Sequence, residues 1–237
     1  MKCVIMYRIA EVTMLLLEKI DQREALRYMG YKSDMPDEKI QGIIDRCEKD
    51  LLAVVKPKFI YKVFDISHGE NAVNVEGTTL VLEGKDISAH LKDCTKCVLL
   101  AATLSSGADM IIRRLEAEDM TKAVITDFLA SAAVEQVCDM VDKTVKSDLP
   151  QLEQTWRFSP GYGDLPIEIQ GEFLQVLDAP KRIGLNATAN NILTPRKSVT
   201  AVIGLSENKI SKGRRGCVIC SMKDTCPYRK RGEHCGS

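Results

Sequence analysis

The stretch of sequence that decides the fold is RFSPGYGDLP, at residues 157–166. Two prolines and two glycines hold such a segment in a fixed path that is neither helix nor strand. A path of this kind can direct backbone amides and carbonyls toward a ligand. Arg157 offers a planar guanidinium that fits a carboxylate, and Tyr162 adds an amphipathic ring. A plain tight turn with a surface arginine would have a similar local sequence, so the surrounding elements have to decide.

Regular elements surround this loop. Apolar residues at three-to-four spacing predict a long helix over 122–146, and a shorter helix is predicted over 167–177. Buried strands are predicted over 97–104 and 199–204, where β-branched and aliphatic residues run together. Further helices are expected at 9–28, 36–55, 87–91 (capped by Asp86) and 107–115, and further strands at 59–64, 79–82 and 156–158, with a polar turn over 69–77. Helices and strands alternate without a regular βαβ rhythm, which predicts an α+β fold with an antiparallel or mixed central sheet flanked by helices.

Several short motifs occur in a fixed order around the loop. The string ASAAVE (130–135) precedes it, and Ile183-Gly184 and then LTPRKSV (193–199) follow it. This order resembles the activation (reactivation) domain of cobalamin-dependent methionine synthase. The resemblance covers roughly residues 86–206 and is weak over 1–85. The combination of motifs is much more specific than any one of them.

The resemblance implies a function. In that family the domain binds S-adenosylmethionine and covers the cobalamin-binding domain while oxidised cobalt is reduced by one electron and remethylated. By motif, Arg157 would hold the methionyl carboxylate, Ser159 would contribute its backbone, Tyr162 would be the tyrosine of the ligand loop, and Glu135 would meet the ammonium group.

Glu135 is also notable without the resemblance. At 3.6 residues per turn it shares a helix face with Phe128, Ser131 and Cys138. A carboxylate among small and apolar residues is costly unless it is paired, and a ligand ammonium is one possible partner. A glutamate that faces water, or one paired with a nearby lysine, is the alternative that the residues leave open.

The sequence departs from the family pattern in three ways. Its 237 residues cannot hold the homocysteine, folate and cobalamin modules, so we expect an accessory protein for a separate methionine synthase polypeptide, not a complete methyltransferase. Gly163 replaces a common proline, which predicts a looser loop. The acidic ligand contact that the family has near its N-terminus is not recognisable in residues 1–85.

Charge divides the chain into two parts. The 33 basic and 33 acidic residues cancel, so no whole-protein field attracts nucleic acid or membrane. However, residues 209–237 hold eight basic and two acidic residues, a charge of +6, which leaves −6 on residues 1–208. We therefore expect an activation-like domain over 1–208 and a basic tail over 209–237. The tail could steer an acidic electron donor of the flavodoxin or ferredoxin type. No apolar run is long enough for a membrane span or signal peptide, which predicts a cytoplasmic protein.

Four of the nine cysteines lie in that tail: Cys217, Cys220, Cys226 and Cys235. Clustered thiolates predict one metal centre, an iron–sulfur cluster or zinc, with unliganded thiols as the alternative. An iron–sulfur centre would suit a process that needs electrons. The alternative functions are an iron–sulfur protein that reductively activates another corrinoid protein, or a module that only clamps one. Cys94 and Cys97 are interpreted as core thiols, and His68 and His90 as structural residues.

Overall fold

The computed structural model describes residues 13–14, 16–31, 35–210 and 224–225. Within these residues, seven strands form one sheet in the order β4-β3-β2-β5-β9-β6, and β1 also pairs with β2. All neighbouring strands are antiparallel. The strands of the sheet are β1 (Thr13–Met14), β2 (Lys58–Gly69), β3 (Ala72–Val75), β4 (Val81–Glu83), β5 (Lys96–Thr103), β6 (Glu153–Gln154) and β9 (Ser198–Ser206). A separate hairpin joins β7 (Asn186–Ala187) to β8 (Leu193–Thr194).

The centre of the sheet is β5, which pairs with β2 on one side and β9 on the other. Every residue of β5 after Lys96 is buried. Successive side chains of a strand point to opposite faces, so β5 contributes to two hydrophobic cores. Val98, Leu100 and Ala102 lie in one core. Cys97, Leu99 and Ala101 lie in the other.

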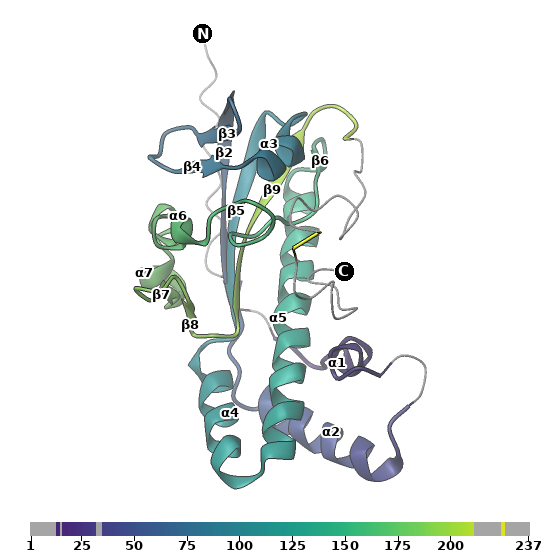
Figure 1. Cartoon of the computed structure of the whole chain (residues 1–237). Coiled ribbons are helices and arrows are strands. Elements are labelled where there is room, and N and C mark those ends of the chain that lie inside the picture. Colours follow the sequence, from purple (N-terminus) through teal and green to yellow (C-terminus); the bar gives the residue numbers. More distant parts are fainter. Residues whose placement is uncertain (1–12, 15, 32–34, 211–223, 226–237) are drawn as a thin grey trace.

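Helices cover both faces of the sheet (Figure 1). One core is closed by α1 (Gln22–Tyr28), α2 (Glu38–Leu52), α4 (Ser106–Glu118) and α5 (Met120–Asp148). The other core is closed by α3 (Lys85–Leu91), α6 (Gln170–Leu177) with its preceding 3-10 turn (Ile167–Ile169), and α7 (Ala179–Ile183). At a rise of 1.5 Å per residue the 29-residue helix α5 is about 44 Å long. It runs along the sheet and continues past one end, where α2 and α4 pack against it.

The predicted α+β class with an antiparallel sheet flanked by helices is therefore confirmed. The fold contains helices matching those predicted at 122–146, 36–55 and 107–115, and strands matching those at 97–104 and 199–204. In the described part of the chain, no helix combines the length and the apolar character needed to cross a membrane. The four tail cysteines Cys217, Cys220, Cys226 and Cys235 lie outside the described residues, so the metal centre and the boundary at residue 209 stay predictions.

Three local predictions were wrong. The helix expected over 9–28 is helical in the described residues only from Gln22, because Asp21 caps it by accepting from the amides of Arg23 and Glu24. Residues 16–20 before it belong to no helix or strand, and the amide of Ile20 donates to the buried carboxylate of Glu48. The polar turn over 69–77 contains the short strand β3. Residues 156–158 form no strand, although Phe158 makes a single antiparallel bridge with Val202.

One smaller prediction also fails. Asp86 does not cap α3, because the N-cap position belongs to Gly84 and the first amides of the helix are satisfied from another part of the chain. Val124 in α5 is 47% exposed, since the start of this helix extends beyond the sheet.

Candidate functional site

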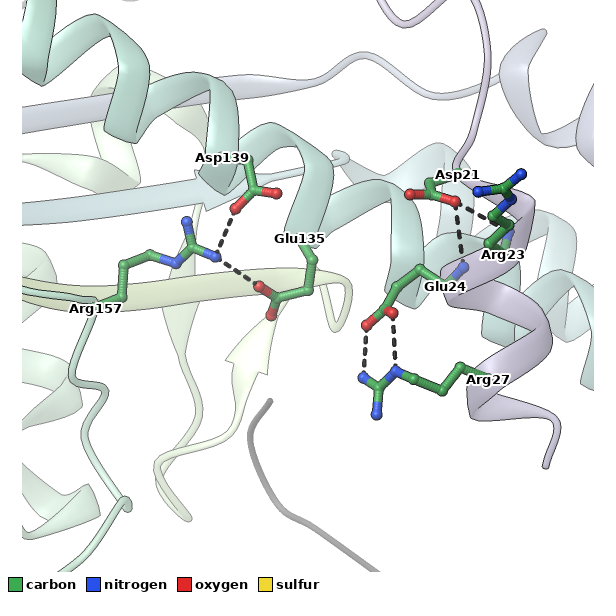
Figure 2. A network of polar contacts seen from close by, with 7 residues as sticks. All are labelled: Asp21, Arg23, Glu24, Arg27, Glu135, Asp139 and Arg157. Carbon is green, nitrogen blue, oxygen red and sulfur yellow. Dashed lines mark hydrogen bonds and ion pairs between the residues drawn. The ribbon is translucent and has the colours of Figure 1, made fainter. Parts of the chain in front are cut away.

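Three carboxylates line one face of α5 at the level of the 157–166 loop. Glu135, Asp139 and Asp142 are spaced by four and three residues, so they lie above one another on the helix surface. Arg157 donates to all three of them. Its Nη2 lies 3.1 Å from Glu135 Oε2 and 3.0 Å from Asp139 Oδ1, and its Nη1 lies 2.5 Å from Asp142 Oδ2. Figure 2 shows the first two of these contacts reaching from the loop to the helix.

Strand-like alternation at the start of the loop explains the direction of Arg157. Phe158 pairs with Val202 on β9, and both Trp156 and Phe158 belong to the core beneath α3 and α6. Arg157 lies between these two rings in sequence, so its side chain leaves the backbone on the opposite side, toward α5. The side chain of Arg157 is only 19% exposed, whereas those of Asp142, Glu135 and Asp139 are 29%, 42% and 63% exposed. The Asp142 contact is thus the most shielded, and the Asp139 contact resembles a surface ion pair worth about 0–1 kcal/mol.

Helix α1 adds a second charged pair next to this cluster. Both Glu24 carboxylate oxygens accept from Arg27, at 2.6 and 2.8 Å, and the Arg27 guanidinium lies 4.7 Å from the centre of the Tyr28 ring. Figure 2 shows this pair facing Glu135 from α1. Gln136 of α5 holds the start of α1 in place, because its amide accepts from the backbone of Asp21 and donates to the carbonyl of Lys19.

Burial is the main influence on the ionisation of Glu135. Partial burial raises the pKa of Glu135, the Arg157 guanidinium lowers it, and the carboxylates of Asp139 and Glu24 raise it again. The net effect is a pKa above the ordinary value of a glutamate. A second cation next to Glu135 would therefore relieve the cost of keeping this carboxylate ionised.

The loop itself is internally bonded. The carbonyl of Ser159 accepts from the amide of Tyr162 at 3.0 Å, and the amide of Gly161 donates to the carbonyl of Leu165 at 2.8 Å. The Tyr162 ring packs edge-on against Trp156 and Phe158, with centroids 5.9 and 5.2 Å apart. The structure thus brings Arg157 and Glu135 together, but it packs the Tyr162 ring with the core on the other face of the sheet.

Helix α3 holds both ends of the loop. At the far end, the Asp164 carboxylate accepts from the amides of Lys85 and Asp86 at 2.7 and 3.0 Å. At the near end, Nε2 of His90 lies 3.0 Å from the carbonyl oxygen of Trp156 and 2.8 Å from the hydroxyl of Thr155. These contacts agree with the structural role predicted for His90.

Gly163 fits closely between the loop and α3. Its φ of +56° is closed to proline, and a Cβ at this position would lie 2.5 Å from a carboxylate oxygen of Asp86. The glycine that replaces the family's proline is therefore part of a close contact, so the expectation that it loosens the loop finds no support in this packing.

Sequence reasoning missed three acidic residues of the cluster. Asp139 and Asp142 lie four and seven residues after Glu135, and this spacing alone would have placed them on its face. Glu24 carries no such signal, because its proximity depends on how α1 packs against α5.

Comparison with solved structures identifies the architecture. No family model matches the chain, and no curated protein matches it. Thirteen chains of solved structures do match. One is the crystal structure of the MetH reactivation domain bound to AdoHcy, with a TM-score of 0.66 and 14% sequence identity, covering 96% of this chain and 86% of that one. The chain has the MetH reactivation-domain fold.

The match confirms at the level of fold the resemblance expected from the sequence. It also extends it, since 96% coverage includes much of the N-terminal region, where the sequence motifs are weak. In this chain the N-terminal region supplies β2, which pairs with β5 near the centre of the sheet, and α1, which brings Glu24 to the cluster around Arg157.

The described cysteines belong to the cores of this fold. Cys94 and Cys97 are buried, as are Cys47 and Cys138. Burial raises the pKa of Cys94 to about 11, with a smaller contribution from Asp93, so this thiol stays protonated at neutral pH. His68 contacts the carbonyl of Cys94, which agrees with its predicted structural role. Among the described residues, no group of three or more histidine, cysteine, aspartate or glutamate side chains could hold a metal ion.

Proposed function

We propose that this protein binds S-adenosylmethionine and serves the reductive reactivation of a cobalamin-dependent methionine synthase carried on a separate polypeptide. Two observations support the proposal. The chain shares its fold with a reactivation domain that was crystallised with AdoHcy, the demethylated form of S-adenosylmethionine. In addition, the loop identified from sequence aims Arg157 at Glu135, a pair that complements the two charges of an amino acid.

The pair could take up the methionyl end of the ligand by exchange. The ligand carboxylate would replace Glu135 on the Arg157 guanidinium, and the ligand ammonium would bind Glu135. One ion pair would thus be replaced by two, and the raised pKa of Glu135 would fall. Asp142 contacts the other terminal nitrogen of Arg157, so it can hold the guanidinium during the exchange. Ser159 and Tyr162 remain proposed contacts of the ligand.

In this function the residues of the chain bind and orient, and they do not transfer a group themselves. When bound, S-adenosylmethionine supplies the methyl group for the reduced cobalt of cobalamin on the partner. The chain would cap the cobalamin module of a methionine synthase that lacks its own activation domain. Such a cap succeeds only if it binds the reactivation conformation better than the catalytic one. A flavodoxin- or ferredoxin-like protein would be the electron donor, and the cytoplasm the expected location.

A titration tests the ligand directly. Trp156 is the single tryptophan of the chain and adjoins Arg157, so its fluorescence is a local reporter. We expect S-adenosylmethionine to change this fluorescence saturably, with the same dissociation constant by calorimetry. Methionine plus adenosine, added as separate molecules, are the control for non-specific effects. Calorimetry that shows no binding by the folded wild-type protein would remove the proposal.

The alternative function, an iron–sulfur protein that reduces another corrinoid protein, depends on Cys217, Cys220, Cys226 and Cys235. It is distinguished by metal content. Anaerobically purified protein should contain iron with sulfide, or zinc, and replacing Cys217 and Cys220 should release it. Metal-free protein from such a preparation would exclude this alternative and leave the S-adenosylmethionine site untouched.

A further inference from the structure

Lys197 forms a second bridge between the sheet and α5. It belongs to the motif LTPRKSV (193–199), to which the proposed function gives no role. Its Nζ lies 2.8 Å from Asp127 Oδ1 and 2.9 Å from Ser131 Oγ, and it also donates to the carbonyl of Asp127 at 3.0 Å. The Lys197 side chain is only 13% exposed, whereas that of Asp127 is 45% exposed. A lysine this enclosed needs partners for its ammonium, and these three acceptors fix its position.

The two bridges contact the same face of α5. Asp127, Ser131 and Glu135 follow one another at intervals of four residues, so they lie on adjoining turns of the helix. Arg157 contacts this face from Glu135 toward the C-terminal end of α5. Lys197 contacts it from Ser131 toward the N-terminal end. The turn between Ser131 and Glu135 is thus framed by one cation on each side.

The sheet places the two cations in the same order. Phe158 makes an antiparallel bridge with Val202, so the chain that follows Arg157 leaves in the direction of the start of β9. Lys197 directly precedes that strand. The loop residue Ser159, a proposed backbone contact of the ligand, therefore begins the path from one cation toward the other.

We propose that the ribose of S-adenosylmethionine binds at Lys197 and Asp127, so that the ligand lies along α5 with its methionyl end at Glu135. The inference rests on the proposed function and deepens it, because it assigns the adenosyl end of the same site. Arg157 itself covers the turns that follow Glu135, which leaves the opposite direction along this face for the rest of the ligand. Asp127 precedes Glu135 by eight residues. This is about 12 Å along the helix, similar to the extended chain between the ammonium nitrogen and the ribose hydroxyls.

The chemistry of the pair suits a ribose. A hydroxyl group can donate to a carboxylate and accept from an ammonium at the same time. Acidic side chains bind ribose hydroxyls in this way in dinucleotide-binding folds. Lys197 contacts Oδ1 of Asp127, and the carboxylate is almost half exposed, so its other oxygen can accept from a hydroxyl of the ligand. Lys197 would keep the carboxylate ionised and in place.

Ligand analogues test this inference on the unaltered protein. The 2′-deoxy and 3′-deoxy forms of S-adenosylmethionine keep the sulfonium and both charges of the amino-acid end, and each lacks one ribose hydroxyl. Calorimetry on the wild type should show that at least one of them binds roughly tenfold more weakly than S-adenosylmethionine, because a site that bonds a hydroxyl discriminates against a ligand without it.

Two variants test whether these residues hold the hydroxyl. Asp127→Ala and Lys197→Met should each reduce the ratio between the dissociation constants of the deoxy analogue and S-adenosylmethionine toward one. A merely structural role of the ion pair would weaken both ligands alike and preserve the ratio. Glu153→Ala is the matched control, because this glutamate is 49% exposed and lies 3.7 Å from another lysine of α5, Lys146. It should keep the wild-type ratio.

The possible outcomes separate this inference from the proposed function. Equal affinity of the wild type for S-adenosylmethionine and both deoxy analogues would overturn the inference and leave the proposed function intact. A ratio that Asp127→Ala and Lys197→Met leave unchanged would do the same. Failure of the wild type to bind S-adenosylmethionine itself would overturn the proposed function as well.

Discussion

The guanidinium of Arg157 lies 3.1 Å from the carboxylate of Glu135, although 22 residues separate them in the chain. One comes from an irregular loop at the edge of the sheet and the other from the middle of the longest helix. The contact joins the two parts of the sequence that most strongly suggest a ligand. Loss of Arg157 leaves the Glu135 carboxylate beside other acids without this cation, whereas loss of Glu135 leaves Arg157 paired with Asp139 and Asp142. Arg157 is therefore the more sensitive place for substitution.

Replacing Arg157 should weaken ligand binding. Arg157→Ala removes the group proposed to hold the methionyl carboxylate, and a charge-assisted hydrogen bond is worth about 1.5–3 kcal/mol, or roughly tenfold to 150-fold in affinity. Calorimetry on the folded variant measures this. Arg157→Lys keeps the charge without the planar fork and should give an intermediate loss. Arg114→Ala, at an exposed arginine of α4, is the control and should bind as the wild type does.

Binding should depend on pH through Glu135. Its pKa is raised in the free protein, and a bound ammonium would lower it, so ligand binding should release protons. Affinity should therefore fall as pH decreases through the raised pKa. Calorimetry in buffers of different ionisation enthalpy detects the proton release, and Glu135→Gln should abolish it. Proton uptake on binding would contradict the assignment of Glu135 to the ammonium group.

The same shift has a consequence for folding. A carboxyl whose pKa is raised in the folded state contributes stability at acidic pH, and this contribution is lost as pH rises through that pKa. Glu135→Gln should thus flatten this part of the stability profile. Chemical unfolding of the wild type and of Glu135→Gln at a series of pH values around this pKa measures the difference in the free energy of unfolding.

Gly163→Ala should disturb the loop. The substitution places a side chain at φ +56° and a Cβ 2.5 Å from Asp86, so we expect a loss of about 1–3 kcal/mol in unfolding free energy and weaker ligand binding. Gly171→Ala in α6 is the matched control. No atom lies within 4 Å of the added Cβ there, and alanine favours a helix by about 0.5–1 kcal/mol over glycine. Equal stability of the two variants would contradict the close contact between the loop and α3.

Asp164→Ala tests whether α3 positions the loop. Removing a carboxylate that caps a helix costs about 1 kcal/mol of stability. Asp37→Ala removes the N-cap of α2, where the carboxylate accepts from the amide of Ile40 at 2.8 Å. Both variants should lose stability, but only Asp164→Ala should also raise the dissociation constant for S-adenosylmethionine. Unchanged ligand affinity in Asp164→Ala would mean that the loop keeps its path without this tie.

Sequence patterns correctly predicted the elements in which the apolar pattern continues over many residues. The helix over 122–146 and the strands over 97–104 and 199–204 have enough apolar positions to show their period, and the structure contains all three. The helix over 9–28 was wrong because Leu17 and Ile20 have helical spacing but lie in a non-helical segment between α2 and α5. Their burial comes from tertiary packing, which local spacing does not record.

The candidate site was predictable to a similar extent. The order of the motifs in the sequence singled out Arg157 and Glu135, and the two side chains are in contact in the structure. Neither the cap that Asp164 provides for α3 nor the proximity of Glu24 to Glu135 could be predicted, because each depends on segments that meet only in the folded chain.

The central claim is most directly tested by mixing this protein with a cobalamin-dependent methionine synthase that lacks its activation domain and whose cobalt is oxidised. With S-adenosylmethionine and a reductant present, we predict that the absorption spectrum of methylcobalamin returns and that turnover recovers, and that Arg157→Ala greatly slows both. No return of methylcobalamin, together with no ligand-dependent association of the two proteins, would contradict the proposed role even if S-adenosylmethionine binds.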